Sequence, residues 1–274
     1  MIKLIISELK DRSRYTTREA AYIILELVTK YGWMQIETED LYYSSEALES
    51  LWLDALGQLP DVVLFWEGYY LLNQRKREIE SLDCVKYVFC DDLHDGEDHS
   101  KHDKLELFSM FDTILATYGY VFDQYYPELR TKRVIWVPHS ASPDFFLPHN
   151  EHPENAILLS GAVNDHYPMR LRVKALADCG SYPIVVHDHP GHRCDFDYQT
   201  NTSIGREYAR RINTYRVAFT DSSKYKYAVA KYFEITATGS LLLADRAVSE
   251  PLKAKGFLDG VHYVGVSNED LERK

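Results

Sequence analysis

Short apolar segments that alternate with amphipathic helical segments constrain this chain more than any other feature of its sequence. Residues 61–66 and 85–90 are rich in β-branched and aromatic side chains, and turn residues bound both segments. Between such segments, as in residues 16–31, apolar residues recur at helical spacing. Strands and helices in alternation indicate a parallel sheet that is covered by helices on both faces.

The alternation falls into two series, separated by residues 138–155, which contain four prolines and no periodicity. We therefore predict an α/β protein with two Rossmann-like domains, residues 1–150 and 151–274, whose parallel sheets face a central cleft. The proline-rich segment should act as a hinge between them. The strands expected in the first domain are 2–6, 61–66, 85–90, 113–117 and 133–137, and those in the second are 156–160, 182–187, 215–220 and 240–244.

The charge of the chain is distributed unevenly. The formal net charge is −11, with 15 Lys and Arg against 26 Asp and Glu in residues 1–150 and 16 against 16 in residues 151–274. Residues 206–231 hold a local excess of basic side chains that could receive a phosphorylated ligand. Nucleic acid is not an expected partner, because sequence-independent binding requires a broad basic face.

Localisation follows from what the sequence lacks. No apolar stretch reaches the length of a membrane span, and no signal-peptide pattern opens the chain. The four cysteines form no CxxC pair and are too sparse for a disulfide framework. We expect a cytoplasmic protein with reduced thiols.

Polar residues that directly follow predicted strands are the candidate site residues, since ligands of open parallel sheets bind beyond the carboxyl ends of the strands. Gly161 opens a loop that reaches Arg170 in the next helix. A glycine lets the backbone approach a ligand, and a helix N-terminus offers free N–H groups to a phosphate. A plain connecting loop explains the same residues without any ligand.

Residues 221–245 contain the second candidate segment, a predicted helix over 225–236 that runs through Gly239 into a strand. Lys231 and Glu234 lie three positions apart on one face of that helix. They could form only a surface ion pair worth about 0.3 kcal/mol. Alternatively, Lys231 binds a diphosphate and Glu234 accepts the two hydroxyls of a ribose.

Several of these segments together resemble a known family. The pattern K-Y-F-E-I-x-A-x-G-S-L-L-L-A-D, which contains Glu234, and the later G-F-x-D-G-x-H-Y at 256–263 are similar to GT-B-fold glycosyltransferases. The similarity is greatest to the CgeB-related group and to retaining family-4 enzymes, the group 1 glycosyl transferases. The Gly161 loop, Pro190-Gly191 and residues 208–213 (YARRIN) follow in the same order. Residues 60–68, 90–94 and 136–146 resemble the first domain of these enzymes more loosely.

The resemblance implies a GT-B-like fold in which the second domain binds a nucleotide-diphosphate sugar of the UDP or GDP type. The residues that it implies for this donor are Gly161, Arg170, Tyr208, Ser222, Lys226, Lys231, Glu234 and Gly239. Many family-4 enzymes have a further glutamate eight positions before Glu234, where this chain has Lys226. That departure leaves both a carboxylate contact to the donor sugar and the stereochemical outcome open.

The acidic first domain is the expected acceptor side. Glu67, Asp92 and His94 follow predicted strands and could take a proton from an acceptor hydroxyl. In a retaining mechanism they would only orient the acceptor. A solvated acidic loop is the alternative that involves no chemistry.

Two groups of histidines in the sequence are candidates for a metal site. Residues 187–194 contain HxHxxHxC, and His94, His99 and His102 form a looser set. Neither spacing matches a known ligand frame, so no metal site and no further cofactor are predicted.

The sequence thus predicts a metal-independent glycosyltransferase with an unidentified glycan, lipid-linked or protein acceptor, and it favours a retaining reaction. Two other functions are compatible with the same residues. A nucleotide-sugar epimerase or hydrolase of this fold would act on the donor without an acceptor. A non-catalytic module would bind the nucleotide sugar without turnover.

Overall fold

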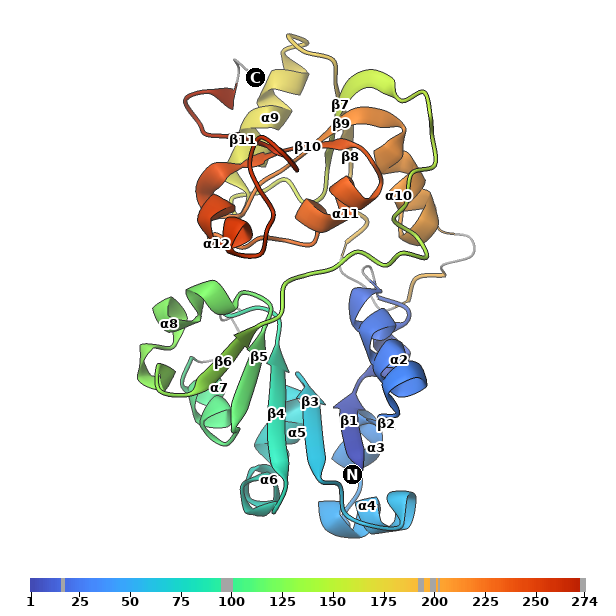
Figure 1. Cartoon of the computed structure of the whole chain (residues 1–274), viewed down its shortest axis with the longest axis vertical. Coiled ribbons are helices and arrows are strands. Elements are labelled where there is room, and N and C mark those ends of the chain that lie inside the picture. The colour runs from blue at the N-terminus through green and yellow to red at the C-terminus, as the bar shows by residue number, and fades with distance from the viewer. Residues whose placement is uncertain (16–17, 95–100, 192–194, 198–200, 202, 272–274) are drawn as a thin grey trace. The chain divides into compact units, whose positions relative to one another are not determined.

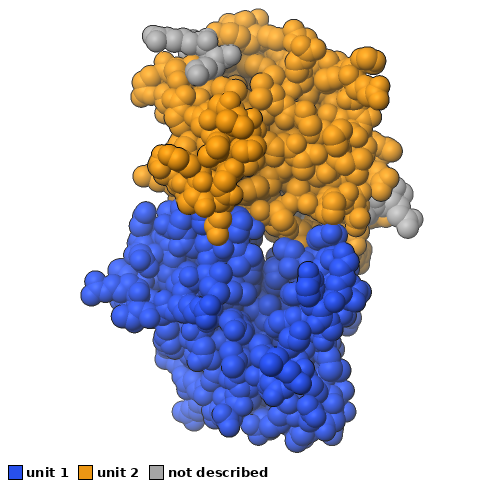
Figure 2. All heavy atoms as spheres, in the orientation of Figure 1, with its two compact units in different colours: residues 1–13, 20–138 blue, residues 14–19, 139–274 orange. Residues whose placement is uncertain are grey.

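The computed structural model describes residues 1–15, 18–94, 101–191, 195–197, 201 and 203–271. The chain forms two compact units, coloured separately in Figure 2. The first unit comprises residues 1–13 and 20–138, and the second comprises residues 14–19 and 139–274. The proline-rich segment from His139 onward thus belongs to the second unit, together with a short N-terminal segment.

The first unit is built on a six-stranded sheet of order β2-β1-β3-β4-β5-β6, in which each neighbouring pair is parallel (Figure 1). The strands are β1 (Lys3–Ser7), β2 (Met34–Glu37), β3 (Val62–Trp66), β4 (Val85–Cys90), β5 (Thr113–Ala116) and β6 (Arg133–Trp136). Because β1 pairs with β2 on one side and with β3 on the other, the strand order reverses between β1 and β3. Ligands of open parallel sheets bind at such a reversal.

Eight helices connect these strands, in the part of the chain that the structure describes. They are α1 (Leu9–Arg12), α2 (Glu19–Tyr31), α3 (Thr38–Tyr42), α4 (Leu48–Leu56), α5 (Tyr69–Gln74), α6 (Lys76–Ser81), α7 (Lys101–Ser109) and α8 (Phe122–Tyr125). Ile24 of α2 packs with Ile5, Leu64 and Phe89 of the sheet in one hydrophobic cluster. Apolar residues at helical spacing in α2 therefore cover this face, as the sequence predicted.

The second unit contains a five-stranded parallel sheet of order β11-β10-β9-β7-β8. Its strands are β7 (Glu154–Ser160), β8 (Ile184–His187), β9 (Tyr215–Thr220), β10 (Leu241–Asp245) and β11 (Val264–Val266). Its helices are α9 (Pro168–Asp178), α10 (Gly205–Asn213), α11 (Lys231–Ala237) and α12 (Ser249–Ala254). Here the strand order reverses between β7 and β9. The two parallel sheets confirm the predicted α/β fold class.

One predicted helix was wrong at its start. We expected a helix over residues 225–236, but α11 begins only at Lys231. Ser223 and Lys226 have φ values of 59° and 58°, in the left-handed region that a right-handed helix excludes. The preceding residues therefore form a compact turn, and Lys226 does not share a helix with Glu234.

The G-F-x-D-G-x-H-Y segment has a structural role in the connection from α12 to β11. Asp259 Oδ1 accepts the Gly265 N–H at 2.7 Å, and Asp259 Oδ2 pairs with Arg246 at 3.1 Å. A Cβ atom at position 265 would lie 2.3 Å from Asp259 Oδ2, so a side chain there would displace the Asp259 carboxylate. These contacts hold the connection from α12 to β11 in place at the edge of the sheet.

Within the part of the chain that the structure describes, none of the helices combines the length and the apolar character that crossing a membrane requires.

Candidate functional site

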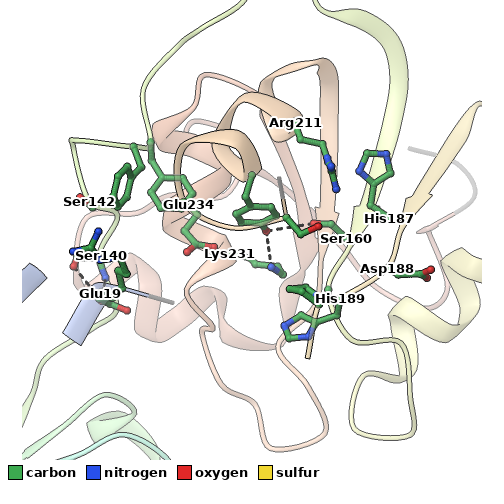
Figure 3. A pocket seen from close by; sticks show the side chains of 18 residues that line it. Glu19, Ser140, Ser142, Ser160, His187, Asp188, His189, Arg211, Lys231 and Glu234 are labelled. Carbon is green, nitrogen blue, oxygen red and sulfur yellow. Dashed lines mark hydrogen bonds between the residues drawn. The ribbon is translucent and has the colours of Figure 1, made fainter. Parts of the chain in front are cut away.

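A pocket in the second unit lies beyond the carboxyl ends of β7 and β8 (Figure 3). Four of the eight predicted donor ligands line this pocket, namely Gly161, Tyr208, Lys231 and Glu234. They come from the loop after β7, from α10 and from α11. The fold therefore brings residues from three separate elements to one end of the sheet, where α/β proteins bind ligands.

Lys231 is held in the middle of the pocket. Its Nζ atom donates a hydrogen bond of 2.5 Å to the Tyr208 hydroxyl and lies 4.7 Å from the centre of that ring. The Tyr208 hydroxyl is in turn 3.4 Å from Ser160 Oγ at the end of β7. This chain of contacts fixes an ammonium group where a negatively charged ligand could reach it.

Gly161 is required by two features of this site. Its φ of +105° is a conformation that residues with a side chain rarely adopt. In addition, a Cβ atom there would lie 2.6 Å from Lys231 Cε and 2.8 Å from Arg170 Nη1. The glycine therefore leaves the space in which the two cationic side chains approach the backbone.

Glu234 is a buried carboxylate at the pocket wall, with only 7% of its surface exposed. Burial raises its pKa, and Glu19 raises it further, while Lys231 and His139 act in the opposite direction. Among the described residues we find no hydrogen-bond donor to this carboxylate. Because this carboxylate lines the pocket and no described residue donates to it, its acceptor sites are available to a ligand.

Arg170 lies directly beside the pocket, but its guanidinium interacts with other groups of the protein. Its Nε atom is 3.1 Å from Asp221 Oδ1, in a pair whose side chains are 3% and 1% exposed. Nη2 donates to the Thr220 hydroxyl at 3.0 Å, and Nη1 donates to the Ala162 carbonyl at 3.2 Å. Arg170 therefore supports the Gly161 loop from behind.

The N-terminus of α9 also differs from the expectation that its N–H groups are free for a phosphate. Asp221 Oδ2 accepts the Met169 and Arg170 N–H groups at 3.0 Å and 3.2 Å. Burial raises the pKa of Asp221, and Arg170 and these two N–H groups counteract the rise. The carboxylate at the end of β9 thus occupies the position that a phosphate would take.

The helix start that does reach the pocket belongs to α10. Ser203 and Gly205 line the pocket, and no side chain among the described residues caps this helix. Uncapped N–H groups and the helix dipole favour an anion at such a position. Arg211 lines the same pocket and adds positive charge.

His187 and Asp188 lie toward one end of the pocket, and Glu19, Ser140 and Glu234 lie toward the other, with Lys231 between them (Figure 3). Burial and the nearby Arg211 lower the pKa of His187. The imidazole is therefore neutral near pH 7, and its buried Nδ1 has no hydrogen-bond partner among the described residues.

The structure places the other three predicted ligands outside the set that lines this pocket. Ser222 is fully buried, and its hydroxyl donates to the Asp245 carboxylate. Lys226 is exposed on the turn before α11. Gly239 ends α11 with a φ of 83° and packs against Pro148.

Sequence reasoning missed the far wall of the pocket. Arg18 and Glu19, from the N-terminal segment, and Ser140, Ser142 and Phe145, from the proline-rich segment, line it. The first two lie more than a hundred positions from the others along the chain. No periodicity or motif in either segment indicates that they meet.

In the first unit, Glu67 follows β3 at the point where the strand order reverses. Its φ of 57° is strained for a residue with a side chain. Its carboxylate pairs with the Arg12 guanidinium, and both side chains are largely buried. Burial raises the pKa of Glu67, Arg12 lowers it, and the neighbouring Asp91 raises it.

Asp92 and His94 lie in the loop that follows β4. Asp92 Oδ1 is 3.8 Å from His94 Nδ1, and their side chains are 58% and 24% exposed. The Asp92 carbonyl accepts the Lys104 ammonium at 3.1 Å. The loop thus presents a carboxylate and an imidazole close together at the same edge of the sheet as Glu67.

Within the described residues, no group of three or more His, Cys, Asp and Glu side chains is arranged to hold a metal ion. Part of both histidine clusters, including His99, His192 and Cys194, lies outside the described residues.

No protein-family model matches this sequence, and no curated protein matches it in sequence. Solved structures do match the fold. An α-glucosyltransferase in complex with UDP and a mismatch-containing 13-mer DNA aligns with a TM-score of 0.56 at 11% identity, over 100% of this chain and 88% of its own. An α-glucosyltransferase in complex with UDP-glucose and DNA that contains an abasic site aligns with a TM-score of 0.55 at 12% identity. The alignment covers 99% of this chain and 88% of the α-glucosyltransferase chain.

This chain has the GT-B fold. The similar structures are those of nucleotide-sugar glycosyltransferases, and at these identities they establish the fold alone. The pneumococcal O-GlcNAc transferase GtfA, in complex with UDP and GlcNAc, aligns with a TM-score of 0.46 at 11% identity over 81% of this chain. This chain spans about half of GtfA, 49% of its length. Because both α-glucosyltransferase structures contain DNA, the absence of a nucleic-acid partner stays a prediction.

Proposed function

We propose that this protein is a glycosyltransferase that takes a sugar from a nucleotide diphosphate held in the pocket of the second unit. The observation that carries the proposal is that Lys231 and Glu234 both line that pocket. A fixed ammonium group and a buried carboxylate without donors fit the two chemically different parts of a nucleotide diphosphate, its phosphates and its hydroxyls. The position beyond the carboxyl ends of β7 and β8 supports the same assignment.

In this proposal the diphosphate lies against Lys231, Arg211 and the N-terminus of α10. These groups neutralise the charge that develops on the diphosphate when the sugar departs. Glu234 accepts hydrogen bonds from the ribose hydroxyls and fixes the orientation of the donor. Arg170 keeps the Gly161 loop in place through Asp221 and does not contact the donor itself.

The acceptor is assigned to the first unit, as a further part of the proposal. In an inverting reaction Glu67 would be the leading candidate for the residue that receives the acceptor proton, because burial raises the pKa of its carboxyl and makes it a stronger base. Asp92 and His94 orient the acceptor hydroxyl in the same proposal. We propose a retaining reaction, in which the departing phosphate serves as the base and Glu67 only orients the acceptor.

Replacing Glu234 with Ala tests the central assignment. Two hydrogen bonds to a charged group correspond to a loss of about 2 to 4 kcal/mol in nucleotide affinity. The melting temperature should stay close to that of the wild type, since the carboxylate lines the pocket and no described residue donates a hydrogen bond to it. Calorimetry with UDP and GDP, alongside Glu250→Ala on the exposed surface of α12, measures the difference. Equal affinity of the folded variant and the wild type for both nucleotides would remove the ribose assignment.

Transfer should survive chelation, because Lys231, Arg211 and the start of α10 supply the positive charge that a divalent ion supplies elsewhere. We expect full activity after treatment with EDTA, measured as sugar transferred from a UDP- or GDP-sugar. Incubation with the donor alone should release little free sugar, which separates transfer from hydrolysis or epimerisation. Loss of activity that Mn or Mg restores would favour a metal at Asp91 and Asp92. Restoration by Zn alone would favour the His187 cluster.

A further inference from the structure

Residues 14–19 are part of the second unit, although the residues on either side of them belong to the first. The Arg14 carbonyl accepts the Phe196 N–H at 3.1 Å, which joins the segment to the loop that follows β8. The Arg18 guanidinium lies 5.9 Å from the centre of the Phe145 ring. Both Arg18 and Glu19 line the pocket.

Three donors hold the Glu19 carboxylate in place. Oε1 accepts the Ser140 N–H and, at 3.0 Å, the Ser140 hydroxyl. Oε2 is 2.7 Å from His139 Nδ1, in a pair whose side chains are 17% and 13% exposed. An ionised carboxylate offers about four acceptor sites, so about one remains unused on Oε2. That remaining site belongs to a carboxylate in the pocket wall, near Glu234.

Ser142 gives an independent indication of a ligand at the same end of the pocket. It lines the pocket, it is 5% exposed, and its hydroxyl has no hydrogen-bond partner among the described residues. A buried hydroxyl without a partner is costly in a folded protein. A ligand with hydroxyl groups would satisfy it.

We infer that Glu19 is a ligand-binding residue that accepts a hydrogen bond from a hydroxyl of the bound nucleotide sugar, with Ser142 beside it. The inference rests on the proposed function and extends it to the chemistry of one end of the pocket. Two carboxylates repel phosphate, so the uncharged, hydroxyl-rich part of the ligand lies between Glu19 and Glu234. The diphosphate lies on the Lys231 side.

The hydroxyl has two possible sources, the ribose and the transferred sugar. Both offer the same chemistry to Glu19, and three probes separate them. UDP carries the ribose but no transferred sugar, and 2′-deoxy-UDP lacks one of the ribose hydroxyls. UDP-glucose carries both the ribose and the sugar. If GDP binds more tightly than UDP, the matching guanosine compounds take their place.

Glu19→Gln tests the inference, because the direction in which nucleotide affinity changes distinguishes a direct hydrogen bond from mere proximity. The amide oxygen can still accept from Ser140, so the loop stays supported, but the negative charge is lost. If Glu19 only stood near the ligand, removing a negative charge beside a diphosphate would leave affinity unchanged or raise it. A direct hydrogen bond to the carboxylate predicts instead a loss of about tenfold or more. Glu26→Gln, farther along α2, is the matched control and should bind as the wild type does.

Weaker binding of Glu19→Gln to UDP, with no further loss when 2′-deoxy-UDP is used, assigns Glu19 to the ribose. Weaker binding to UDP-glucose with unchanged affinity for UDP assigns it to the sugar. Unchanged or tighter binding to both ligands overturns the inference while leaving the proposed function intact. Failure of the wild type to bind any of these nucleotides overturns both.

Ser142→Ala adds a variant in which stability and affinity should move in opposite directions. Removal of an unpartnered buried hydroxyl should keep the melting temperature or raise it. Affinity for the ligand should fall by about fivefold, because the ligand loses a hydrogen-bond partner of ordinary strength. Unchanged affinity would show that the hydroxyl does not meet the ligand.

Discussion

Replacing Asp221 with Ala should destabilise the second unit by about 3 to 5 kcal/mol, because it leaves the buried Arg170 guanidinium without its countercharge. The variant also removes the acceptor for two N–H groups at the start of α9. Both losses occur where water cannot replace the missing carboxylate. We expect a large shift in the unfolding of this unit without direct loss of a pocket residue.

The distribution of tryptophan makes this effect measurable for each unit. All four tryptophans, Trp33, Trp52, Trp66 and Trp136, belong to the first unit. Urea unfolding followed by circular dichroism should therefore show the Asp221→Ala transition shifted to lower denaturant. The transition followed by tryptophan fluorescence should stay close to that of the wild type.

A double-mutant cycle supplies the control for this prediction. Arg170→Met alone should also be costly, since it leaves the Asp221 carboxylate buried and unpaired. Arg170→Met combined with Asp221→Ala should cost less than the sum of the two single changes. Additive costs would show that the two side chains do not stabilise the fold as a pair.

The second large effect is expected on binding. Lys231→Glu should reduce nucleotide affinity by at least about 100-fold, because it removes the fixed cation and places a third carboxylate beside Glu234 and Glu19. Lys253→Glu changes the net charge equally at an exposed position of α12 and should bind nearly as the wild type does. Calorimetry with UDP and GDP measures both variants.

The same calorimetry, together with a measurement of transfer, tests whether the first unit acts on the acceptor and the second unit binds the donor. Glu67→Gln and Asp92→Asn should lower the rate of transfer and leave nucleotide affinity nearly unchanged, since both residues belong to the first unit. If either variant weakens nucleotide binding as much as Lys231→Glu does, the acceptor-side assignment fails.

The strands could be predicted from the sequence because buried parallel strands appear as continuous apolar runs. The predicted segments 85–90 and 215–220 coincide with β4 and β9. Strand β2 was missed because it is a four-residue edge strand, and none of its residues is fully buried. An edge strand that is partly exposed carries no such run.

For the candidate site, sequence could indicate residues that share an element but not those that meet through the fold. Lys231 and Glu234 lie on one helix, and their proximity follows from helical spacing. Asp221 reaches the start of α9 across 51 to 52 positions, and Glu19 reaches Ser140 across 121. Contacts at such separations depend on tertiary packing, which a single sequence does not reveal.

The membership of residues 14–19 in the second unit has a consequence for how such a protein can be recombined. A single cut after Pro138 does not separate the two units, because the second unit also includes a piece of the chain that precedes most of the first. A chimaera that inherited residues 139–274 alone would carry Lys231 and Glu234 but would leave Glu19 with the other parent. Exchange of the complete pocket between proteins of this kind therefore requires two grafts, and selection would have to act on both segments together.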